Sequence, residues 1–474
     1  MARQGSNGWG VGSDFLVLEQ FGLSDAMVCS GVRWSVLGVE WLYALNDRSR
    51  STSRRTASEV LKQAAQRHAG DGFQPRLTPS YQVFSGDFLG KRSTPMSASR
   101  FVFHTRLCDL LGIDYPILQS GMGGIAGPDL AATVSNAGGL GILAGFLLTA
   151  DQLREAIRTI RRQTDKPFGV NLLLPPEVRP PMQFTDLSEQ IVQTVQTTLN
   201  PFRAHLGLPP KSERPAQLPD LIPESFQVIL EEHVPVFSVG LGNPGAEMVE
   251  ACHRHGMKII AMVTTVEDAR AVEATGLDAV VAQGAEAGGH RSHFIKPAAG
   301  ESGTIGTVAL VPEVVDAVRI PVIAAGGIAD GRGLVSALAL GASGILMGTR
   351  FVATRESMAP EPHKKAVLER SANATTLTDV LSGRFARALR NAFTDAYART
   401  GAPVLPFPWQ YINAMDIYRE ATVQGNADYL PLWGGQSMGV IHDLPGAAEV
   451  IEATIQEARA LLLERFPQMV KLDQ

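Results

Sequence analysis

Short apolar runs alternate with helical patterns along most of the chain, from about residue 115 onward. The runs have the length of buried strands, and the segments between them carry apolar residues at three- and four-residue spacing. Strands are predicted at residues 116–119, 139–143, 168–172, 234–239, 258–263, 278–282, 321–325 and 344–347. Helices are predicted at residues 129–136, 150–163, 245–255, 266–275, 311–318 and 331–340. This alternation predicts an α/β fold of the (β/α)8 type, a TIM barrel.

The connection after the third predicted strand is unusually long. Two proline-rich pieces, at 175–181 and 209–219, lie on either side of a helical pattern at 187–200. Barrel loops at this end of a strand usually contribute to the ligand site. We interpret the connection either as part of the site wall or as an insertion.

After Phe351 the pattern becomes mostly helical, and we expect this block to cap the barrel mouth. Helices are predicted in it at residues 361–371, 378–399 and 411–424. Trp409 and Tyr411 are equally consistent with a pocket wall and with packing. A final helix, at 447–466, is expected to pack back on the barrel.

The first hundred residues differ from the rest of the chain in composition and in pattern. They are rich in Ser, Arg, Gly and Gln and show little sustained periodicity apart from a helical pattern at 56–67. This composition is typical of segments that bury too little apolar surface to fold. This composition and pattern change beside Met96, which suggests that translation starts there. The intact mass of the native protein would test this hypothesis.

We therefore divide the chain into four predicted segments. They are a low-order extension at 1–100, a ligand-binding barrel at 101–355, a helical cap or substrate domain at 356–428, and a C-terminal segment at 429–474 that packs back on the barrel.

The composition argues against several classes of function. Hydrophobic residues make up 45% of 474 residues, enough for a large core. The formal net charge is −5 and the folded part contains no large basic run, so no nucleic acid is expected. No stretch supplies the ~20 apolar residues of a membrane span. Cys29, Cys108 and Cys252 are far apart, which favours the reducing cytoplasm over a disulfide framework or a zinc site.

One segment contains the strongest candidate for a catalytic residue. The predicted strand at 278–282 is followed by Gln283, small residues and one acid, the pair Gly288–Gly289, and then His290. Glycine pairs allow backbone conformations that bring N–H groups close to a ligand. Barrels bind ligands at the carboxyl ends of their strands, so we interpret His290 as catalytic rather than as a surface histidine.

Two later glycine loops predict a phosphate site. AAGGIADG, at 324–331, follows the seventh predicted strand, and MGTRF, at 347–351, follows the eighth. These are the barrel loops that most often bind phosphate, because glycine lets amides converge on the oxygens and a helix N-terminus adds partial positive charge. The alternative is that the glycines only permit tight turns.

A Rossmann dinucleotide site and a metal site are the competing interpretations. Residues 121–126, GMGGIA, fit G-x-G-x-x-A, but the acidic residue expected about twenty positions later is absent. We interpret them as the first barrel loop. Glu286, His290 and His293 are close in sequence, but the glycines between them disfavour the helix that would align the first two. No metal site is therefore expected.

The sequence is similar to the nitronate monooxygenases, formerly called 2-nitropropane dioxygenases, in motifs that occur in the same order. These are PILQSGMGG, FGVNLLL, AQGAEAGGHR, PVIAAGGIADG and MGTRF. The similarity extends from about Thr105 to the C-terminus. It implies an FMN-containing barrel that oxidises alkyl nitronates, with nitroalkanes as a further substrate, by O2 to a carbonyl compound and nitrite.

The resemblance also implies the residues of the site. His290 matches the family's catalytic histidine, as a base or as the group that binds the nitronate. The flavin-contacting positions correspond to Gly121, Met122, Gly123, Asn171, Gln283, Gly288, Gly289, Gly326, Gly327, Gly348, Thr349 and Gln436. The FMN phosphate would lie on the two late glycine loops, with the isoalloxazine near His290. The expected partners are a small nitronate and O2, and a homodimer is left open.

Two alternatives stay open. Many family members have proline where this chain has Gly121, and the GMGG form also occurs in the related flavin-dependent enoyl-acyl-carrier-protein reductases, which would use NAD(P)H and an enoyl thioester. We favour the monooxygenase because His290–Arg291, GTVALVPEVVDAV and the C-terminal helical block are more similar to it. A flavin-binding protein without turnover is less favoured, since it would not need to retain His290.

Overall fold

The structure is a computed structural model that describes residues 32–36, 39–43, 103–175, 187–214, 219–294 and 303–470. The chain divides into two compact units, Met1–Thr94 and Pro95–Gln474. In the first unit, β1 (Val32–Val36) and β2 (Val39–Tyr43) pair as antiparallel strands. The helix predicted at 56–67 lies outside the described residues.

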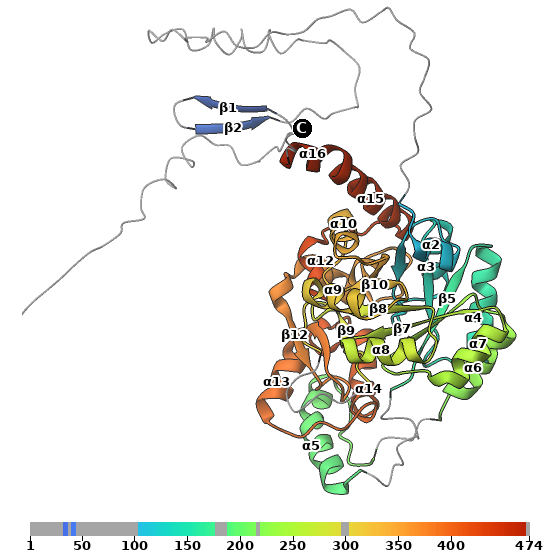
Figure 1. Ribbon diagram of the computed structural model, residues 1–474. Coiled ribbons are helices and arrows are strands. Elements are labelled where there is room, and N and C mark those ends of the chain that lie inside the picture. Colours follow the sequence, from blue (N-terminus) through green and yellow to red (C-terminus); the bar gives the residue numbers. More distant parts are fainter. Residues whose placement is uncertain are drawn as a thin grey trace, which may run out of the picture. The chain divides into compact units, whose positions relative to one another are not determined.

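Eight parallel strands form a closed barrel in the second unit (Figure 1). They are β3 (Ile117–Gln119), β4 (Gly141–Ala144), β5 (Phe168–Leu173), β6 (Val236–Gly240), β7 (Lys258–Val263), β8 (Ala279–Gln283), β10 (Val322–Ala325) and β11 (Gly344–Met347). The hydrogen-bonded order is β3-β11-β10-β8-β7-β6-β5-β4, and a parallel bridge between Leu118 and Leu140 joins its two ends. Each predicted strand is present close to its predicted bounds, and the TIM barrel is confirmed.

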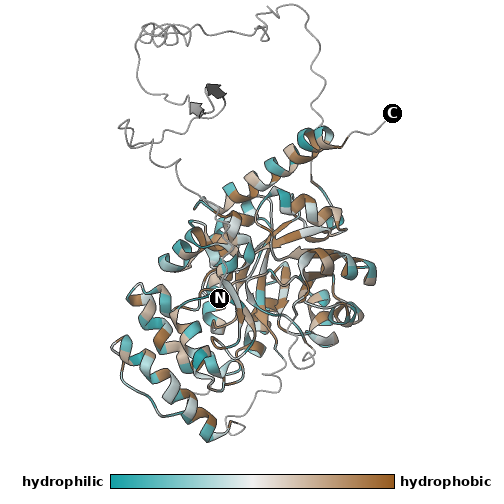
Figure 2. Ribbon diagram, turned by 90° about the vertical axis from the view of Figure 1, so that its left-hand side faces the viewer, coloured by the Kyte–Doolittle hydropathy of each residue, from teal (hydrophilic) through white to brown (hydrophobic). Residues whose placement is uncertain are grey.

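Helices surround the barrel and cover the apolar outer faces of its strands (Figure 2). They are α3 (Pro128–Asn136), α4 (Ala150–Gln163), α6 (Ile222–Glu231), α7 (Gly245–Arg254), α8 (Val266–Ala274), α9 (Thr307–Ala317) and α10 (Gly331–Ala339). Side-chain caps set some of their starts. Thr149 and Gln152 form a reciprocal capping box on α4, and Asp330 accepts from two backbone N–H groups of α10. The sequence patterns did not predict α6.

Alternation along the strands decides which side chains reach the barrel interior. In β8, Val280 and Ala282 pack toward the helices, whereas Ala279 and Val281 belong to a separate cluster inside the barrel. The next inward position is Gln283, at the carboxyl end of the strand. A short helix that was not predicted, α2 (Arg106–Leu111), contributes Leu107 to the interior cluster.

A cap with its own apolar cluster lies beside the barrel mouth. It contains helices α5 (Glu189–His205), α12 (Glu361–Glu369), α13 (Ala392–Thr400) and α14 (Trp409–Val423), the short helices η4 (Ala372–Ala374), η5 (Ala427–Tyr429) and η6 (Gln436–Val440), and a sheet of β12 (Thr375–Thr378), β13 (Ala386–Leu389) and β9 (Gly289–His290). Helix α5 comes from the long third connection. Its buried Arg203 donates to Asp416 at 2.9 Å and to the Asn413 carbonyl at 2.7 Å on α14. That part of the connection is therefore built into the cap.

The helix predicted at 378–399 is wrong. The segment contains the end of β12, a turn at Ser382–Gly383, strand β13 and only then α13. Gly383 has φ +90° and packs against the Leu405 carbonyl, a conformation and a space that exclude a side chain. Asn391 then caps α13 by accepting from the Thr394 N–H. The apolar residues of this segment are spaced as in a helix, but the turn at Gly383 divides them between a strand and a later helix.

The final helix lies against the barrel helices α3 and α10. It runs as α15 (Ala447–Ala460), a π-helical turn (Leu461–Arg465) and α16 (Phe466–Met469). The Gly331 N–H donates to the Glu457 carboxylate at 2.9 Å, which fixes the start of α10 on α15.

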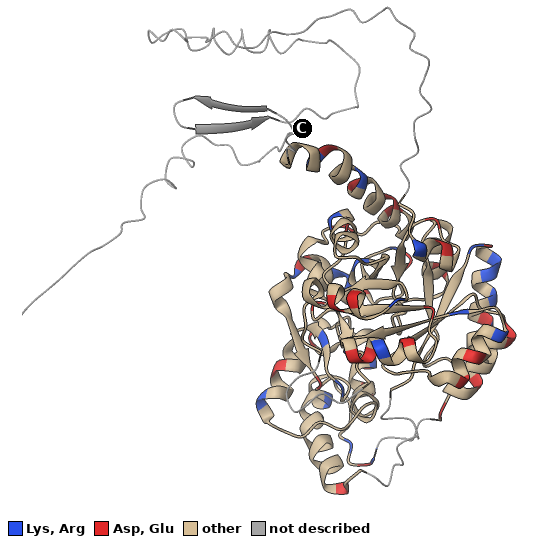
Figure 3. Cartoon of the chain, viewed as in Figure 1, with Lys and Arg blue, Asp and Glu red and all other residues tan. Residues whose placement is uncertain are grey.

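Charged residues of both signs lie mainly on the helices around the barrel, and its strands contain few of them (Figure 3). Among the described residues, no helix is long and apolar enough to cross a membrane.

Candidate active site

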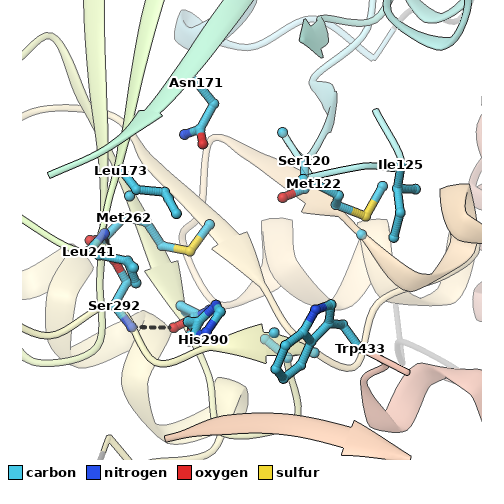
Figure 4. A pocket seen from close by; sticks show the side chains of 18 of the residues that line it. Ser120, Met122, Ile125, Asn171, Leu173, Leu241, Met262, His290, Ser292 and Trp433 are labelled. Atoms are coloured by element: carbon cyan, nitrogen blue, oxygen red, sulfur yellow. Dashed lines mark hydrogen bonds between the residues drawn. The ribbon is translucent and has the colours of Figure 1, made fainter. Parts of the chain in front are cut away.

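A cavity of about 310 Å3 lies at the carboxyl ends of the barrel strands, and Figure 4 shows part of its lining. It gathers almost all the residues that the sequence analysis singled out. Those that line it are Gly121, Met122, Gly123, Asn171, Gln283, Gly288, Gly289, His290, Gly326, Gly327, Gly348 and Thr349. Gln436 is not part of the lining, although Gly435 and Ser437 are. The Gln436 N–H instead donates to the Glu286 carbonyl at 2.9 Å, beside the cavity.

Asn171 offers an unused acceptor to the cavity. Its Nδ2 donates to the Ser238 carbonyl and hydroxyl, both at 3.1 Å. Its Oδ1 is buried and has no hydrogen-bond partner in the structure. Buried polar atoms are normally satisfied, so this oxygen points to a ligand that brings a donor. Gly121 makes this arrangement possible, since a Cβ atom there would lie 2.5 Å from the Asn171 Cβ.

Gln283 orders the loop that carries His290. Its Nε2 donates to the His290 carbonyl at 3.0 Å, and its Oε1 accepts from the Ser292 N–H at 3.0 Å. Buried Arg291 secures the same loop from the other side by donating to the Gln283 carbonyl at 2.9 Å and to the Gly284 carbonyl at 2.8 Å. The side chain of Gln283 is thus committed to the protein, which the motif alone did not indicate.

His290 is held between aromatic rings at one side of the cavity. Its ring lies 5.3 Å from the Phe407 ring and 5.0 Å from the Trp433 ring, centroid to centroid. Its Nε2 lies 2.8 Å from the Ser382 hydroxyl. Burial, with the positive charge of Arg384 as a second cause, lowers the pKa of His290 to about 3. The imidazole is therefore neutral at physiological pH.

The late glycine loops form another part of the cavity wall. Gly326 and Gly327 have φ values of 111° and 72°, which side chains rarely adopt. Gly348 precedes the short helix α11 (Thr349–Val352), and the Thr349 hydroxyl accepts from the Gly435 N–H at 2.9 Å. A loop of glycines followed by a short extra helix is the arrangement in which barrels bind phosphate.

Glu286 also lines the cavity, but its carboxylate is engaged by the protein. It accepts from the Thr307 N–H at 2.9 Å and from the Thr307 hydroxyl at 2.8 Å, at the start of α9. Helix N-termini stabilise carboxylates in this way. No cluster of metal-ligating residues occurs in the part of the chain that the structure describes.

Ser382, Phe407 and Trp433 are cavity residues that the sequence analysis missed. All three lie in or beside the cap, more than ninety residues from His290 along the chain, so no local pattern connects them to it. The Ser382–Gly383 pair was a usable signal, because serine followed by glycine marks a turn within an apparent helix.

A second cavity, of about 620 Å3, shares a wall with the first. Tyr411, Ile412 and Met415 of α14 line both cavities, and Trp409 lines the outer one. Trp409 and Tyr411, which the sequence left open between a pocket wall and packing, thus both line a cavity. The Tyr411 ring also packs against the Tyr418 ring, with 5.4 Å between their centroids. Pro175 and Pro219, in the long third connection, line the outer cavity as well.

Comparison with known proteins identifies the family. The family model of nitronate monooxygenase matches residues 104–457. This chain belongs to the nitronate monooxygenase family. A probable nitronate monooxygenase of Staphylococcus saprophyticus is 35% identical over 372 residues, which cover 76% of this chain and 98% of that protein. A probable nitronate monooxygenase of Staphylococcus aureus strain N315 is 37% identical over 346 residues, covering 70% and 91%.

Solved structures agree with this membership. Nitroalkane oxidase from Streptomyces ansochromogenes superposes with a TM-score of 0.67 at 35% identity and covers 75% of this chain and 99% of its own. FabK from Thermotoga maritima gives a TM-score of 0.61 at 34% identity, covering 77% and 99%. The family resemblance stated from the motifs is confirmed, and the protein is a flavin-dependent oxidoreductase of the nitronate monooxygenase family.

Proposed function

We propose that this nitronate monooxygenase family member binds FMN and oxidises alkyl nitronates, and neutral nitroalkanes after proton abstraction, with O2 to a carbonyl compound and nitrite. One observation carries the proposal. A single cavity brings His290, an unused buried acceptor and the two late glycine loops together.

The residues that line the cavity are compatible with FMN. Gly326, Gly327 and Gly348 line the cavity and have no side chain that would obstruct a single phosphate. The unpartnered Asn171 Oδ1 would accept from a ring N–H of the isoalloxazine. Bound FMN would supply the transfer of electrons from the nitronate to O2.

His290 would act on the substrate as a neutral base. Its lowered pKa keeps the ring unprotonated at physiological pH, so a lone pair is available to take the α-proton of a nitroalkane. In the free enzyme the protonated form of His290 is disfavoured, so the imidazole is neutral before the substrate binds. Phe407 and Trp433 pack on the ring and limit the access of water to it.

Arginine side chains around this loop favour an anionic substrate. Arg291, Arg384 and Arg387 all donate to backbone carbonyls of residues 283–293. Burial and the neighbouring Arg387 lower the pKa of Arg291 to about 9, which still leaves it cationic at neutral pH. The positive charge of Arg384, which adds to the effect of burial in disfavouring an imidazolium at His290, would also stabilise a nitronate beside it.

Reduction of an enoyl thioester is the second candidate function, and the outer cavity is the observation that favours it. That cavity is larger than the inner one and is lined largely by apolar side chains such as Leu173, Leu430 and Leu432. A long acyl chain would fit such a space, whereas a small nitronate would need only the inner cavity.

Anaerobic mixing of the purified holoenzyme distinguishes the two functions. We expect a nitronate to bleach the flavin absorbance rapidly and NAD(P)H to bleach it slowly or not at all. Rapid bleaching by NAD(P)H, followed by reoxidation with an enoyl thioester, would instead establish the reductase. Nitrite formation on admitting O2 to the nitronate sample is the matching product measurement.

A further inference from the structure

The contact between His290 and Ser382 joins a barrel loop to a turn of the cap. Ser382 is fully buried, and its hydroxyl lies 2.8 Å from the His290 Nε2. We find no partner for the His290 Nδ1 among the described residues, and the partly exposed side chain borders the cavity. The two ring nitrogens therefore have different environments.

The direction of the hydroxyl proton follows from a second neighbour. The Ser382 hydroxyl donates to the Arg384 carbonyl at 3.2 Å, and a carbonyl oxygen can only accept. A hydroxyl has one proton, and when that proton lies on the bond to the Arg384 carbonyl, the side of Ser382 Oγ that faces His290 presents a lone pair. In this arrangement the His290 Nε2 carries the proton of the 2.8 Å hydrogen bond.

The turn that carries Ser382 is fixed to the histidine loop at several points. The N–H groups of Ser382 and Gly383 both donate to the Asp379 carbonyl, at 3.1 and 2.7 Å. The Arg291 N–H donates to the Phe385 carbonyl at 2.9 Å, and Ala386 pairs with His290 across β13 and β9. Such a turn can hold the hydroxyl in place against the ring.

We propose that Ser382 is a positioning residue that selects the tautomer of His290 with the proton on Nε2, so that Nδ1 is the atom that takes the substrate proton. This inference rests on the proposed function and deepens it. When Nδ1 accepts the α-proton of a nitroalkane, the C–H bond electrons remain on the substrate as the nitronate. The ring becomes an imidazolium whose Nε2–H still donates to Ser382.

The direct test is nitrogen NMR of the holoenzyme labelled with 15N-histidine. His290→Asn identifies the signals of His290 by their loss. We expect a protonated Nε2 and an unprotonated Nδ1 at neutral pH, and the opposite tautomer would overturn the proposal. This readout needs no turnover, so it stands even if the enzyme oxidises neither nitronates nor nitroalkanes, an outcome that would refute the proposed function alone.

Substitution of Ser382 supplies a second test in the same holoenzyme. Ser382→Ala should lower kcat on a neutral nitroalkane by about tenfold, the value of one hydrogen bond, and change kcat on the preformed nitronate by less than about twofold. Ser382→Thr keeps the hydroxyl and should restore nitroalkane turnover. Equal losses on both substrates would overturn the proposal, because proton abstraction is needed only for the nitroalkane.

Ser357→Ala is the matched control. Ser357 is buried and accepts one backbone hydrogen bond, from the Ala359 N–H at 3.1 Å, but lines neither cavity. It should leave the ratio of the two activities unchanged. If Ser382→Thr does not fold because of its added methyl group, the NMR measurement on the native protein decides the question.

Discussion

Gly288 and Gly435 are in direct backbone contact beside the cavity. A Cβ atom on Gly288 would lie 2.6 Å from the Gly435 nitrogen, and one on Gly435 would lie 2.7 Å from the Gly288 nitrogen. The neighbouring Gln436 N–H donates to the Glu286 carbonyl. Gly288 therefore allows the cap to approach the barrel closely, and it also shapes the cavity.

Gly288→Ala should separate these two loops. Backbone atoms cannot move aside as a flexible side chain can, so we expect a loss of about 1–3 kcal/mol in the free energy of unfolding. The purified variant should also retain less flavin per protein. Flavin absorbance and Tm are the measurements. Gly439→Ala is the control, since its Cβ would meet Ala372 at an ordinary 3.5 Å, and equal effects of the two variants would contradict this explanation.

His290→Asn should separate cofactor binding from proton abstraction. Asparagine is close in size and keeps a polar side chain beside Ser382, so the flavin should be retained. Loss of a general base should lower turnover of neutral nitroalkanes by about a hundred- to ten-thousand-fold. Oxygen consumption with a nitroalkane and with its nitronate measures both. Unchanged turnover on both forms would remove His290 from the mechanism.

Histidines whose pKa values are lowered in the folded protein should make its stability depend on pH. Burial lowers the pKa of His363 to about 4, although its bond to the Trp433 carbonyl opposes this, and lowers the pKa of His293 and His290 to about 4 and 3. The unfolded chain, with histidine pKa values of about 6.5, then binds more protons at pH 5. The free energy of unfolding should therefore fall as pH drops from about 6.5 toward 4.

His363→Gln tests this dependence at one position. Glutamine keeps a donor for the Trp433 carbonyl but cannot take up a proton. We expect the difference in unfolding free energy between pH 7.5 and pH 5 to shrink by about 2 kcal/mol. Urea denaturation at the two pH values gives that difference, and an unchanged difference would show that His363 does not titrate on unfolding.

The barrel could be predicted because its signals are local. In β8, the run of apolar residues and the glycines after it fix both the strand and the position of His290 at its end. The same holds for the loops with Gly326 and Gly348, so the cavity lining follows from the order of the strands.

The cap could not be predicted in the same way. Strand β9 is only two residues long, too short for any periodicity, and it exists because Ala386 of β13 pairs with His290. The helix predicted across β13 failed for the related reason that apolar spacing there matched a helix until Gly383 turned the chain. Ser382 and Trp433 reach His290 only through this tertiary packing.

Asn171→Ala should weaken flavin binding while it leaves the barrel intact. The variant keeps the Cβ atom against which Gly121 packs, but removes the unpartnered Oδ1 and the two bonds to Ser238. One lost hydrogen bond to the cofactor should raise the Kd for FMN by about tenfold. Fluorescence titration of the apoprotein measures this Kd. Asn243→Ala, which removes the acceptor of the Gly245 N–H outside both cavities, should leave the Kd unchanged. An unaltered Kd in Asn171→Ala would mean that the unused oxygen has another ligand.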